Sequence, residues 1–197
     1  MQTVPNPFNT PWQAKFLRMN CIHPKLQEAA TAIEHFCHRW IMGNYDQSIL
    51  VLVGYPGCGK THLLKAVERF SRGAQSLAHK KRSERAQDVL SKVPSVMYAF
   101  WPAIAGELSK GRDWPLQDAT DADLLLWDDL GAENDPWKNI ADGACQILSR
   151  RERKFTVVTT NIKPDQWPER FDERISDRLF RNSVIVDLSE VPSYAMR

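Results

Sequence analysis

The chain has 197 residues, of which 43% are hydrophobic and 25% are charged, and its formal net charge is +2. This length is enough for one well-buried domain with short extensions and excludes two full domains, while the composition excludes a disordered chain. Because the net charge is close to zero, any binding to nucleic acid must come from local basic patches and not from the overall field.

The first part of the chain predicts an arm, a helix and a strand. Residues 1–23 carry closely spaced prolines and aromatic residues, so we expect an irregular arm and a candidate partner-binding segment. From Pro24, apolar residues recur every three or four positions up to Gly43, which is the pattern of an amphipathic helix. The aliphatic run 49–53 then predicts a strand that is buried on both faces of a parallel sheet.

Residues 54–61 fit the P-loop pattern G-x-x-x-x-G-K-[ST] at every fixed position, with a predicted strand before them and a predicted helix over 61–70 after them. Three glycines let the backbone curl around a phosphate chain with its N–H groups turned inward. Lys60 is expected to reach the β- and γ-phosphates, and Thr61 is expected to offer its hydroxyl to Mg²⁺. The predicted nucleotide-binding residues are Gly54, Tyr55, Pro56, Gly57, Cys58, Gly59, Lys60, Thr61 and His62.

A polar, basic segment follows over 71–94, and we interpret it as an insertion that is partly helical over 83–92. It includes the run from His79 to Arg85, which is either a solvated helix face or a patch that contacts DNA. A strand over 96–100, a short helix near 102–110 and a polar loop are predicted next.

The strand predicted over 123–129 is apolar and ends in two acids. We expect Asp128 to hold Mg²⁺, usually through water, and Asp129 to orient and polarise the attacking water. The alternative is a solvated pair of carboxylates that opens the next turn.

Two further elements carry candidate residues. A helix predicted over 136–154 ends in the basic run 150–154, and the strand over 155–161 ends in Asn161. The Asn161 amide is a candidate sensor of the γ-phosphate or of the attacking water, or else it caps the turn before Pro164.

The helix predicted over 165–180 and the residue after it carry four arginines spaced three or four residues apart: Arg170, Arg174, Arg178 and Arg181. They form either a surface ladder of ion pairs or the source of an arginine finger that acts on the γ-phosphate of a neighbouring subunit. A last strand over 183–188 and a tail over 191–197 complete the chain. Strands that alternate with helices five times predict an α/β fold with a parallel sheet.

Taken in order, these motifs resemble the AAA+ ATPases, in particular the initiator and helicase-loader branch of DnaC and IstB-like proteins, and more distantly DnaA. The residues that carry the resemblance are 59–64, 127–131, 159–161 and 173–179. It implies a three-layer P-loop NTPase over residues 24–190, with a five-stranded parallel sheet in the order 5-1-4-3-2. It also implies ATP and Mg²⁺ bound between subunits of a ring or helical filament, with Arg178 as the finger and Arg174 as second choice.

This chain departs from the family pattern in three ways. Asp129 stands where the superfamily usually has glutamate, so its carboxylate reaches about 1.5 Å less far and hydrolysis is expected to be slow. We also expect no complete C-terminal lid, and the N-terminal arm is shorter than the helicase-binding domain of full-size loaders.

The resulting hypothesis is an ATP-hydrolysing helicase loader that acts on single-stranded DNA, on a replicative helicase, or on both. Three alternatives stay open: an IstB-like transposition regulator that coats duplex DNA, a nucleotide-gated adaptor, and a small monomeric P-loop kinase or NTPase. The four cysteines lack C-x-x-C spacing, and the sequence has neither a signal-peptide pattern nor a long apolar run, so we expect a cytoplasmic protein without membrane contact.

Overall fold

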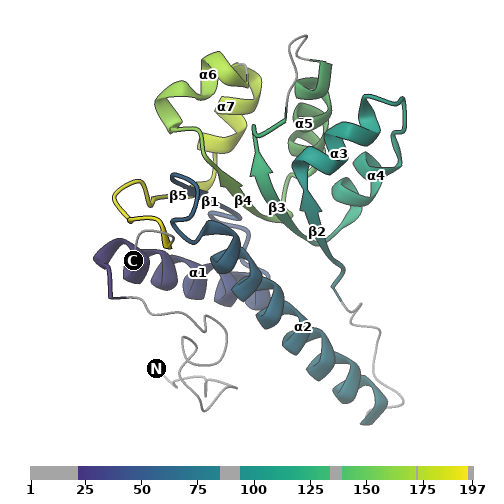
Figure 1. Cartoon of the computed structure of the whole chain (residues 1–197). Helices are drawn as coiled ribbons and strands as arrows, with labels where there is room; N and C mark the ends of the chain where they lie inside the picture. The colour runs from purple at the N-terminus through teal and green to yellow at the C-terminus, as the bar shows by residue number, and fades with distance from the viewer. Residues whose placement is uncertain (1–21, 85–93, 134–138, 172, 195–197) are drawn as a thin grey trace.

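The computed structural model describes residues 22–84, 94–133, 139–171 and 173–194 of the chain. Its centre is a parallel sheet with the strand order β2-β3-β4-β1-β5 (Figure 1). The strands are β1 (Ile49–Val53), β2 (Val96–Phe100), β3 (Leu124–Leu130), β4 (Phe155–Thr160) and β5 (Ser183–Asp187). The predicted α/β class is confirmed, and so is the predicted order 5-1-4-3-2, which is this order read from the other edge.

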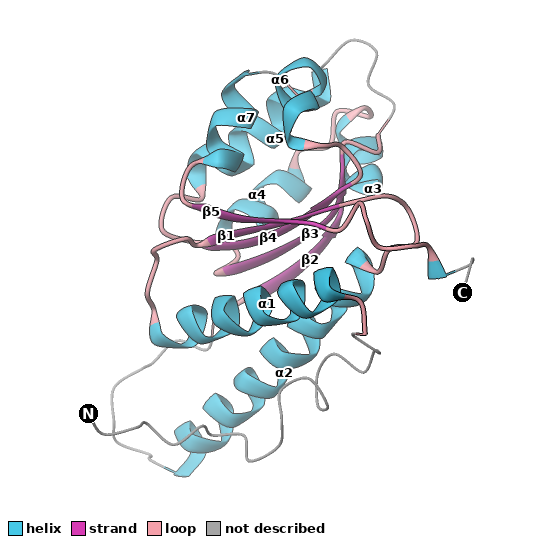
Figure 2. Ribbon diagram, turned by 90° about the vertical axis from the view of Figure 1, so that its left-hand side faces the viewer, coloured by secondary structure: helices cyan, strands magenta, loops and turns pink. Residues whose placement is uncertain are grey.

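The sheet separates two hydrophobic cores because successive residues of a strand face opposite sides. Leu50 and Leu52 of β1 belong to the core under α1 and α2, whereas Val51 and Val53 belong to the core under the remaining helices. Figure 2 shows α1 and α2 on one face of the sheet and α3 to α7 on the other. Burial on both faces explains why the inner strands read as continuous apolar runs.

Helices α1 (Pro24–Met42) and α2 (Lys60–Glu84) cover the first face. The side chain of His23 caps the start of α1, and Gly43 ends it in the left-handed conformation at φ +64°. The prediction that the P-loop helix ends near residue 70 is wrong, because α2 continues through 71–84. This segment has no proline before Pro94 and is rich in good helix formers, so nothing in it stops the helix.

Two predictions around the P-loop helix lie outside, or mostly outside, the described residues. The predicted helix over 83–92 has only its first two residues within them, and the predicted N-terminal arm over 1–23 has only its last two. Across the described ranges, no helix is long and apolar enough to cross a membrane.

The second face is covered by short helices. They are α3 (Trp101–Leu108), α4 (Trp114–Asp121), α5 (Asn139–Arg150), the 3-10 turn η2 (Pro164–Gln166), α6 (Trp167–Arg170) and α7 (Glu173–Phe180). Helix α4 replaces part of the predicted polar loop, because Pro115 suits a first helical turn and Ala119 is buried on the inner face. The single helix predicted over 165–180 is also wrong, because a 3-10 turn, α6 and α7 take its place. Pro168 lies in the first turn of α6 and explains why α6 begins separately from the 3-10 turn.

Helix α5 ends at Arg150, four residues earlier than predicted, so the basic run 150–154 forms a turn and not a helix face. Arg151 in this turn is 5% exposed, and its guanidinium is held by the acceptors Ala119 O, Ala122 O, Phe155 O and Thr156 Oγ1 at 2.6–2.9 Å. Lys154 donates to Thr120 O at 2.7 Å. These two cations satisfy carbonyl groups at the C-terminal end of α4, where helix carbonyls lack partners within the helix.

Candidate functional site

The carboxyl ends of the parallel strands meet at one edge of the sheet, where ligands of open α/β folds bind. The P-loop follows β1, Asp128 and Asp129 lie at the end of β3, and Asn161 follows β4. A cavity of about 390 Å³ opens there. It is lined by Pro56, Gly57, Gly59, Lys60, Thr61, His62, Asp129 and Asn161.

The P-loop turns sharply from β1 into α2. Gly57 has φ +82°, and a Cβ atom added there would overlap Ser193, so both the turn and the close contact favour glycine. Helix α2 begins at Lys60, which leaves the N–H groups of its first turn without acceptors inside the helix. The Lys60 ammonium is 4% exposed and donates to Gly54 O at 2.7 Å and to Tyr55 O at 3.0 Å.

Some predicted P-loop residues lie beside the cavity without lining it. Cys58 is fully buried in the core on the α1 and α2 side, with its Sγ 3.8 Å from Lys60 Nζ. Tyr55 is 54% exposed, and Lys163 lies 5.8 Å from the centre of its ring. These two side chains therefore fill or border the loop, and of these residues the backbone alone is placed to take part in the predicted phosphate binding.

Asp128 is 2% exposed and lies behind the cavity. Its Oδ1 atom accepts hydrogen bonds from Thr61 Oγ1 at 3.2 Å and from Thr159 Oγ1 at 2.5 Å. Its Oδ2 atom accepts one from the Tyr98 hydroxyl at 2.6 Å. The carboxylate is thus fixed beside the hydroxyl of Thr61. These are the two groups that the sequence predicts to bind Mg²⁺.

Asp129 faces a different environment from its neighbour in the chain. The pairing of β3 with β4 shifts register between Trp127 and Leu130, and Asp129 has φ +57°. Such a bulge re-aims a side chain, so Asp129 lines the cavity although a regular strand would turn it to the opposite face from Asp128. Burial, together with the Asp128 carboxylate, raises the pKa of Asp129, and Lys60 opposes this effect.

Asn161 also lines the cavity, and its Oδ1 atom is buried without a protein hydrogen-bond partner in the described part of the chain. The turn after β4 is capped instead by Thr160, whose Oγ1 accepts from Ile162 N at 3.1 Å. The Thr-Thr-Asn segment thus caps this turn through Thr160, while the hydrogen bonds of the described residues assign no such role to the Asn161 side chain. A buried acceptor without a partner is open to a donor such as a bound water molecule.

The residues present fit a nucleotide with Mg²⁺. Thr61 and Asp128 provide hard oxygen donors next to each other, which is the donor type that Mg²⁺ prefers. Lys60 supplies a buried positive charge beside the glycine-rich turn, and Asn161 supplies an unsatisfied amide oxygen. When bound, Mg²⁺ would neutralise charge on the phosphate oxygens.

Comparisons with known proteins were made by sequence and by structure. No family model matches the chain, and no curated protein matches its sequence. A DnaI structure matches with a TM-score of 0.65 and 22% identity, covering 90% of this chain and 89% of that one. A DnaC helicase loader matches with a TM-score of 0.62 and 18% identity, covering 89% and 97%.

A third solved structure, a replication initiator DnaA bound to AMPPCP and single-stranded DNA, matches with a TM-score of 0.63 and 19% identity. The match covers 88% of this chain and 49% of that one, so this chain spans about half the length of DnaA. The chain has the AAA+ fold. The predicted resemblance to AAA+ initiators and helicase loaders is thereby confirmed at the level of the fold.

The four arginines that the sequence spaces three or four residues apart differ in their contacts. Arg170 Nη2 donates to the backbone of the segment after Asp129, at Gly131 O (3.0 Å) and Glu133 O (2.8 Å), and pairs with the Glu133 carboxylate. Arg174 pairs with Asp142 at 3.0 Å, and Arg181 pairs with Asp177 at 2.6 Å. Arg178 donates to Arg174 O at 2.9 Å and, within the described ranges, has no acidic partner. Arg181 thus pairs with an acid one turn away, as a ladder along the helix predicts, whereas Arg170 and Arg174 pair with acids of other segments. None of the four arginines lines the cavity.

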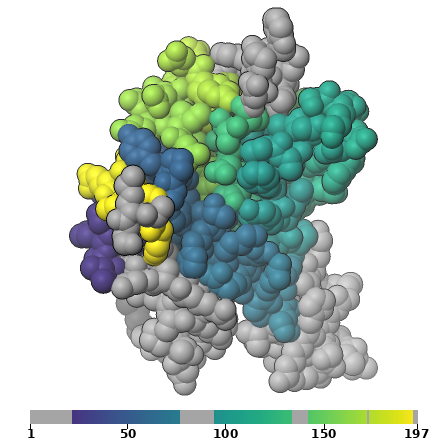
Figure 3. Space-filling view, viewed as in Figure 1, coloured from purple at the N-terminus to yellow at the C-terminus, as the bar shows by residue number. Residues whose placement is uncertain are grey.

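Three contributions to the site were missed by sequence reasoning. Thr159 was read only as part of the Thr-Thr-Asn strand end, yet it bonds Asp128 and also accepts from Asp129 N at 2.9 Å. Tyr98 carries the one hydroxyl in the otherwise apolar sequence of β2, but its partner Asp128 lies on another strand. The segment after β5 lies against the P-loop, with Tyr194 N bonded to Gly57 O at 3.0 Å. Figure 3 shows this yellow segment beside the blue segment that contains the P-loop.

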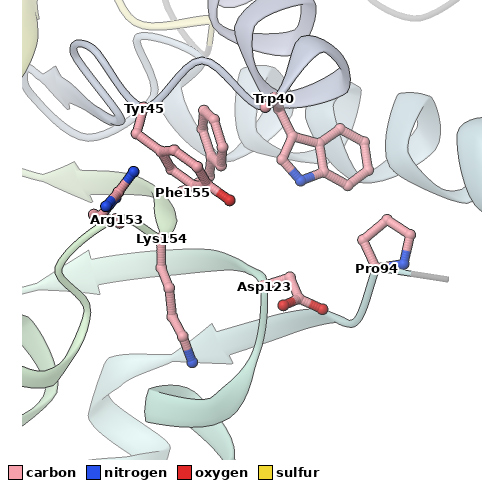
Figure 4. A pocket seen from close by; sticks show the side chains of 8 residues that line it. Trp40, Tyr45, Pro94, Asp123, Arg153, Lys154 and Phe155 are labelled. Carbon is pink, nitrogen blue, oxygen red and sulfur yellow. The ribbon is translucent and has the colours of Figure 1, made fainter. Parts of the chain in front are cut away.

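A second cavity, of about 200 Å³, lies at the opposite edge of the AAA+ sheet (Figure 4). Its lining includes Trp40, Tyr45, Asp123, Arg153 and Phe155. The Tyr45 and Phe155 rings pack 5.2 Å apart, and the Arg153 guanidinium lies 5.7 Å from the centre of the Tyr45 ring.

The basic run 150–154 contributes to this second region in a way that the sequence did not predict. Arg151 is buried and Lys154 is bound to backbone carbonyls, so neither forms part of a freely solvated patch. Burial lowers the pKa of Arg151 to about 10, which keeps the guanidinium charged at neutral pH. Two of the four cations of this run, Arg151 and Lys154, are therefore structural, whereas Arg150 and Arg153 are exposed.

Proposed function

We propose that the protein is a Mg²⁺-dependent ATPase that assists DNA replication as a helicase loader. The observation that carries this proposal is the convergence of Lys60, Thr61, Asp129 and Asn161, from separate segments, on one cavity. The hydrogen bond between Thr61 and Asp128 adds the magnesium-binding pair beside it. These residues offer a suitable group for each part of a bound nucleotide complex: the phosphates, the metal ion that accompanies them and the water that attacks the γ-phosphate.

Each residue would have a distinct role. Lys60 would exchange its bonds to the P-loop carbonyls for the phosphates, and the amides of the first turn of α2 would hold them. Asp129 would accept a proton from the attacking water, and the Asn161 amide would orient that water or the γ-phosphate. Thr61 and Asp128 would hold Mg²⁺.

The structural neighbours support the choice of biological role. The DnaA neighbour is bound to AMPPCP and single-stranded DNA, and the DnaC neighbour is a helicase loader. We therefore propose ATP as the nucleotide, and single-stranded DNA, a replicative helicase or both as partners. The protein would assemble with copies of itself into a ring or helical filament.

Arg178 is proposed as the arginine finger that completes the site of a neighbouring subunit. Its lack of an acidic partner in the described chain supports it over Arg174, whose guanidinium already pairs with Asp142. A guanidinium that is not neutralised by its own subunit is available to the γ-phosphate of another. Without it the barrier stays high, so turnover would depend on assembly.

The test is ATP hydrolysis per subunit measured over a range of protein concentrations, with and without DNA. We expect the rate to rise with protein concentration or with DNA, and to fall by at least about 10³-fold in Arg178→Ala while nucleotide binding survives. Arg181→Ala is the matched control, because Arg181 is exposed and pairs with Asp177 on its own helix. A wild-type rate per subunit that is independent of concentration and DNA would contradict the proposal.

One observation favours a second candidate, a nucleotide-gated adaptor that binds ATP with negligible hydrolysis. Asp129 has a shorter reach than the glutamate usual at its position, which weakens its hold on the attacking water. Tight, Mg²⁺-dependent binding of ATP without phosphate release, even at high protein concentration with DNA, would select this candidate. Stimulation by duplex DNA in preference to single strands would instead select the IstB-like regulator.

A further inference from the structure

We infer that Tyr98 is a positioning residue for Asp128 and that Lys65 holds Tyr98 in place; this inference rests on the proposed ATPase function. The Tyr98 hydroxyl donates to Asp128 Oδ2 at 2.6 Å, while Thr61 and Thr159 both donate to Oδ1. A hydroxyl bond to a carboxylate at this distance is among the stronger hydrogen bonds in proteins. Both carboxylate oxygens of Asp128 are thus fixed by hydroxyls from three different elements.

The ring of Tyr98 is itself held by a cation. Lys65 Nζ lies 3.4 Å from the centre of the ring, and the same ammonium pairs with Glu68 at 2.9 Å. A lysine over the face of a tyrosine is attracted by the ring, which favours one position of the ring. Lys65 lies one turn after Thr61 on α2, so one face of this helix contacts Asp128 directly through Thr61 and the ring of Tyr98 through Lys65.

Tyr98 is not placed to contact the proposed nucleotide directly. Tyr98 does not line the cavity, so its hydroxyl acts on the nucleotide through Asp128 alone. The terminal torsion of an aspartate is soft, and without the bond on Oδ2 the carboxylate is held through Oδ1 alone, so its orientation beside Thr61 is less well fixed. Removing the hydroxyl should therefore weaken the hold on Mg²⁺ and leave metal-free nucleotide binding intact.

The experiment compares wild-type protein with Tyr98→Phe, which removes the hydroxyl and keeps the ring under Lys65. Binding of a fluorescent, non-hydrolysable ATP analogue is measured in EDTA and then across a titration of Mg²⁺. We expect affinity in EDTA to change less than about twofold, and the Mg²⁺ concentration for half-saturation to rise about tenfold, which corresponds to about 1.4 kcal/mol.

Two further variants sharpen the test. Tyr45→Phe makes the same chemical change at the opposite edge of the sheet and should follow the wild type. Lys65→Gln removes the cation over the ring and should raise the half-saturating Mg²⁺ concentration about threefold, in the range of a partly exposed cation–π contact. If Tyr98→Phe fails to fold, Lys65→Gln carries the test.

The outcomes are distinguishable. If the half-saturating Mg²⁺ concentration is the same in wild type and in a folded Tyr98→Phe, the role of Tyr98 is overturned and the ATPase proposal is kept. The role of Tyr98 is also overturned if nucleotide binding by Tyr98→Phe weakens equally with and without Mg²⁺, because that result indicates a general structural defect. Wild-type protein that binds no nucleotide at any Mg²⁺ concentration would overturn the ATPase proposal and the role of Tyr98 with it.

Discussion

At the scale of single residues, two adjacent aspartates have different surroundings. Asp128 is almost fully buried and bonded to three hydroxyls, whereas Asp129 is half-buried and lines the cavity. The cause is the left-handed conformation of Asp129, which a residue other than glycine adopts at a cost of about 1 kcal/mol and which is common at functional sites. This difference in surroundings supports the proposal that Asp128 serves metal binding and Asp129 the attacking water.

Asp129→Asn tests this division of roles. The amide keeps the shape of the side chain but cannot accept a proton, so we expect hydrolysis to fall by about 10²–10⁴-fold while nucleotide affinity stays within a few-fold. Phosphate release and equilibrium binding of a fluorescent nucleotide measure the two effects. Asp118→Asn, on the exposed face of α4, is the control and should behave as wild type. Full hydrolysis by Asp129→Asn would remove Asp129 from the mechanism.

At this scale, the role of a residue could be predicted from the sequence where the groups that it acts with belong to the same local motif. Lys60 and Thr61 were predicted because the P-loop pattern contains the whole local arrangement, and both line the cavity. Tyr98 could not be assigned, because its hydroxyl bonds a carboxylate that is 30 residues away in the chain. Only the pairing of β2 with β3 brings the two together.

At the scale of elements, the turn between α5 and β4 shows how a charged run can be structural. Arg151 reaches across to the C-terminal end of α4 and donates to two of its carbonyl groups at 2.7 Å, and Lys154 adds a third acceptor. The negative end of the helix dipole and the orphaned carbonyls together stabilise these cations. Capping thus explains Arg151 and Lys154, while Arg150 and Arg153 of the same run are exposed.

We expect Arg151→Met to lower the free energy of unfolding by about 3–5 kcal/mol, because it leaves several buried carbonyls without donors. Urea denaturation measures this change. Arg150→Met, at the neighbouring exposed position, is the matched control and should stay within about 0.5 kcal/mol of wild type. A loss no larger for Arg151→Met than for Arg150→Met would show that the turn does not depend on these hydrogen bonds.

At the scale of the whole molecule, the site is assembled from both ends of the described chain. The P-loop follows the second strand from one edge of the sheet, and the segment after the last strand folds back onto it through Tyr194. Leu188 and Val191 of this segment are buried in the core beside α1 and α2. Binding of a nucleotide at the P-loop should therefore stabilise the fold as a whole.

This coupling predicts a thermal shift. A nucleotide with Mg²⁺ at about 100 times its dissociation constant should stabilise the protein by about 2.7 kcal/mol, which for a chain of this size corresponds to about 5–10 °C in melting temperature. Thermal denaturation followed by circular dichroism measures the shift. The melting temperature of Lys60→Ala should hardly change when nucleotide is added to it. If the melting temperature of the wild-type protein does not change when nucleotide is added, the proposed nucleotide site is contradicted.

The sequence by itself determined the class of the fold and the positions along the chain of the P-loop, the two aspartates and Asn161, because hydrophobic periodicity and local motifs act over a few residues. The strand order was predicted only through the resemblance to the AAA+ ATPases. The tertiary structure decided the Tyr98 bond to Asp128, the burial of Arg151 and the contact of the C-terminal segment with Gly57. Each of these joins residues that are distant in the chain, and no local pattern encodes which strands or turns become neighbours.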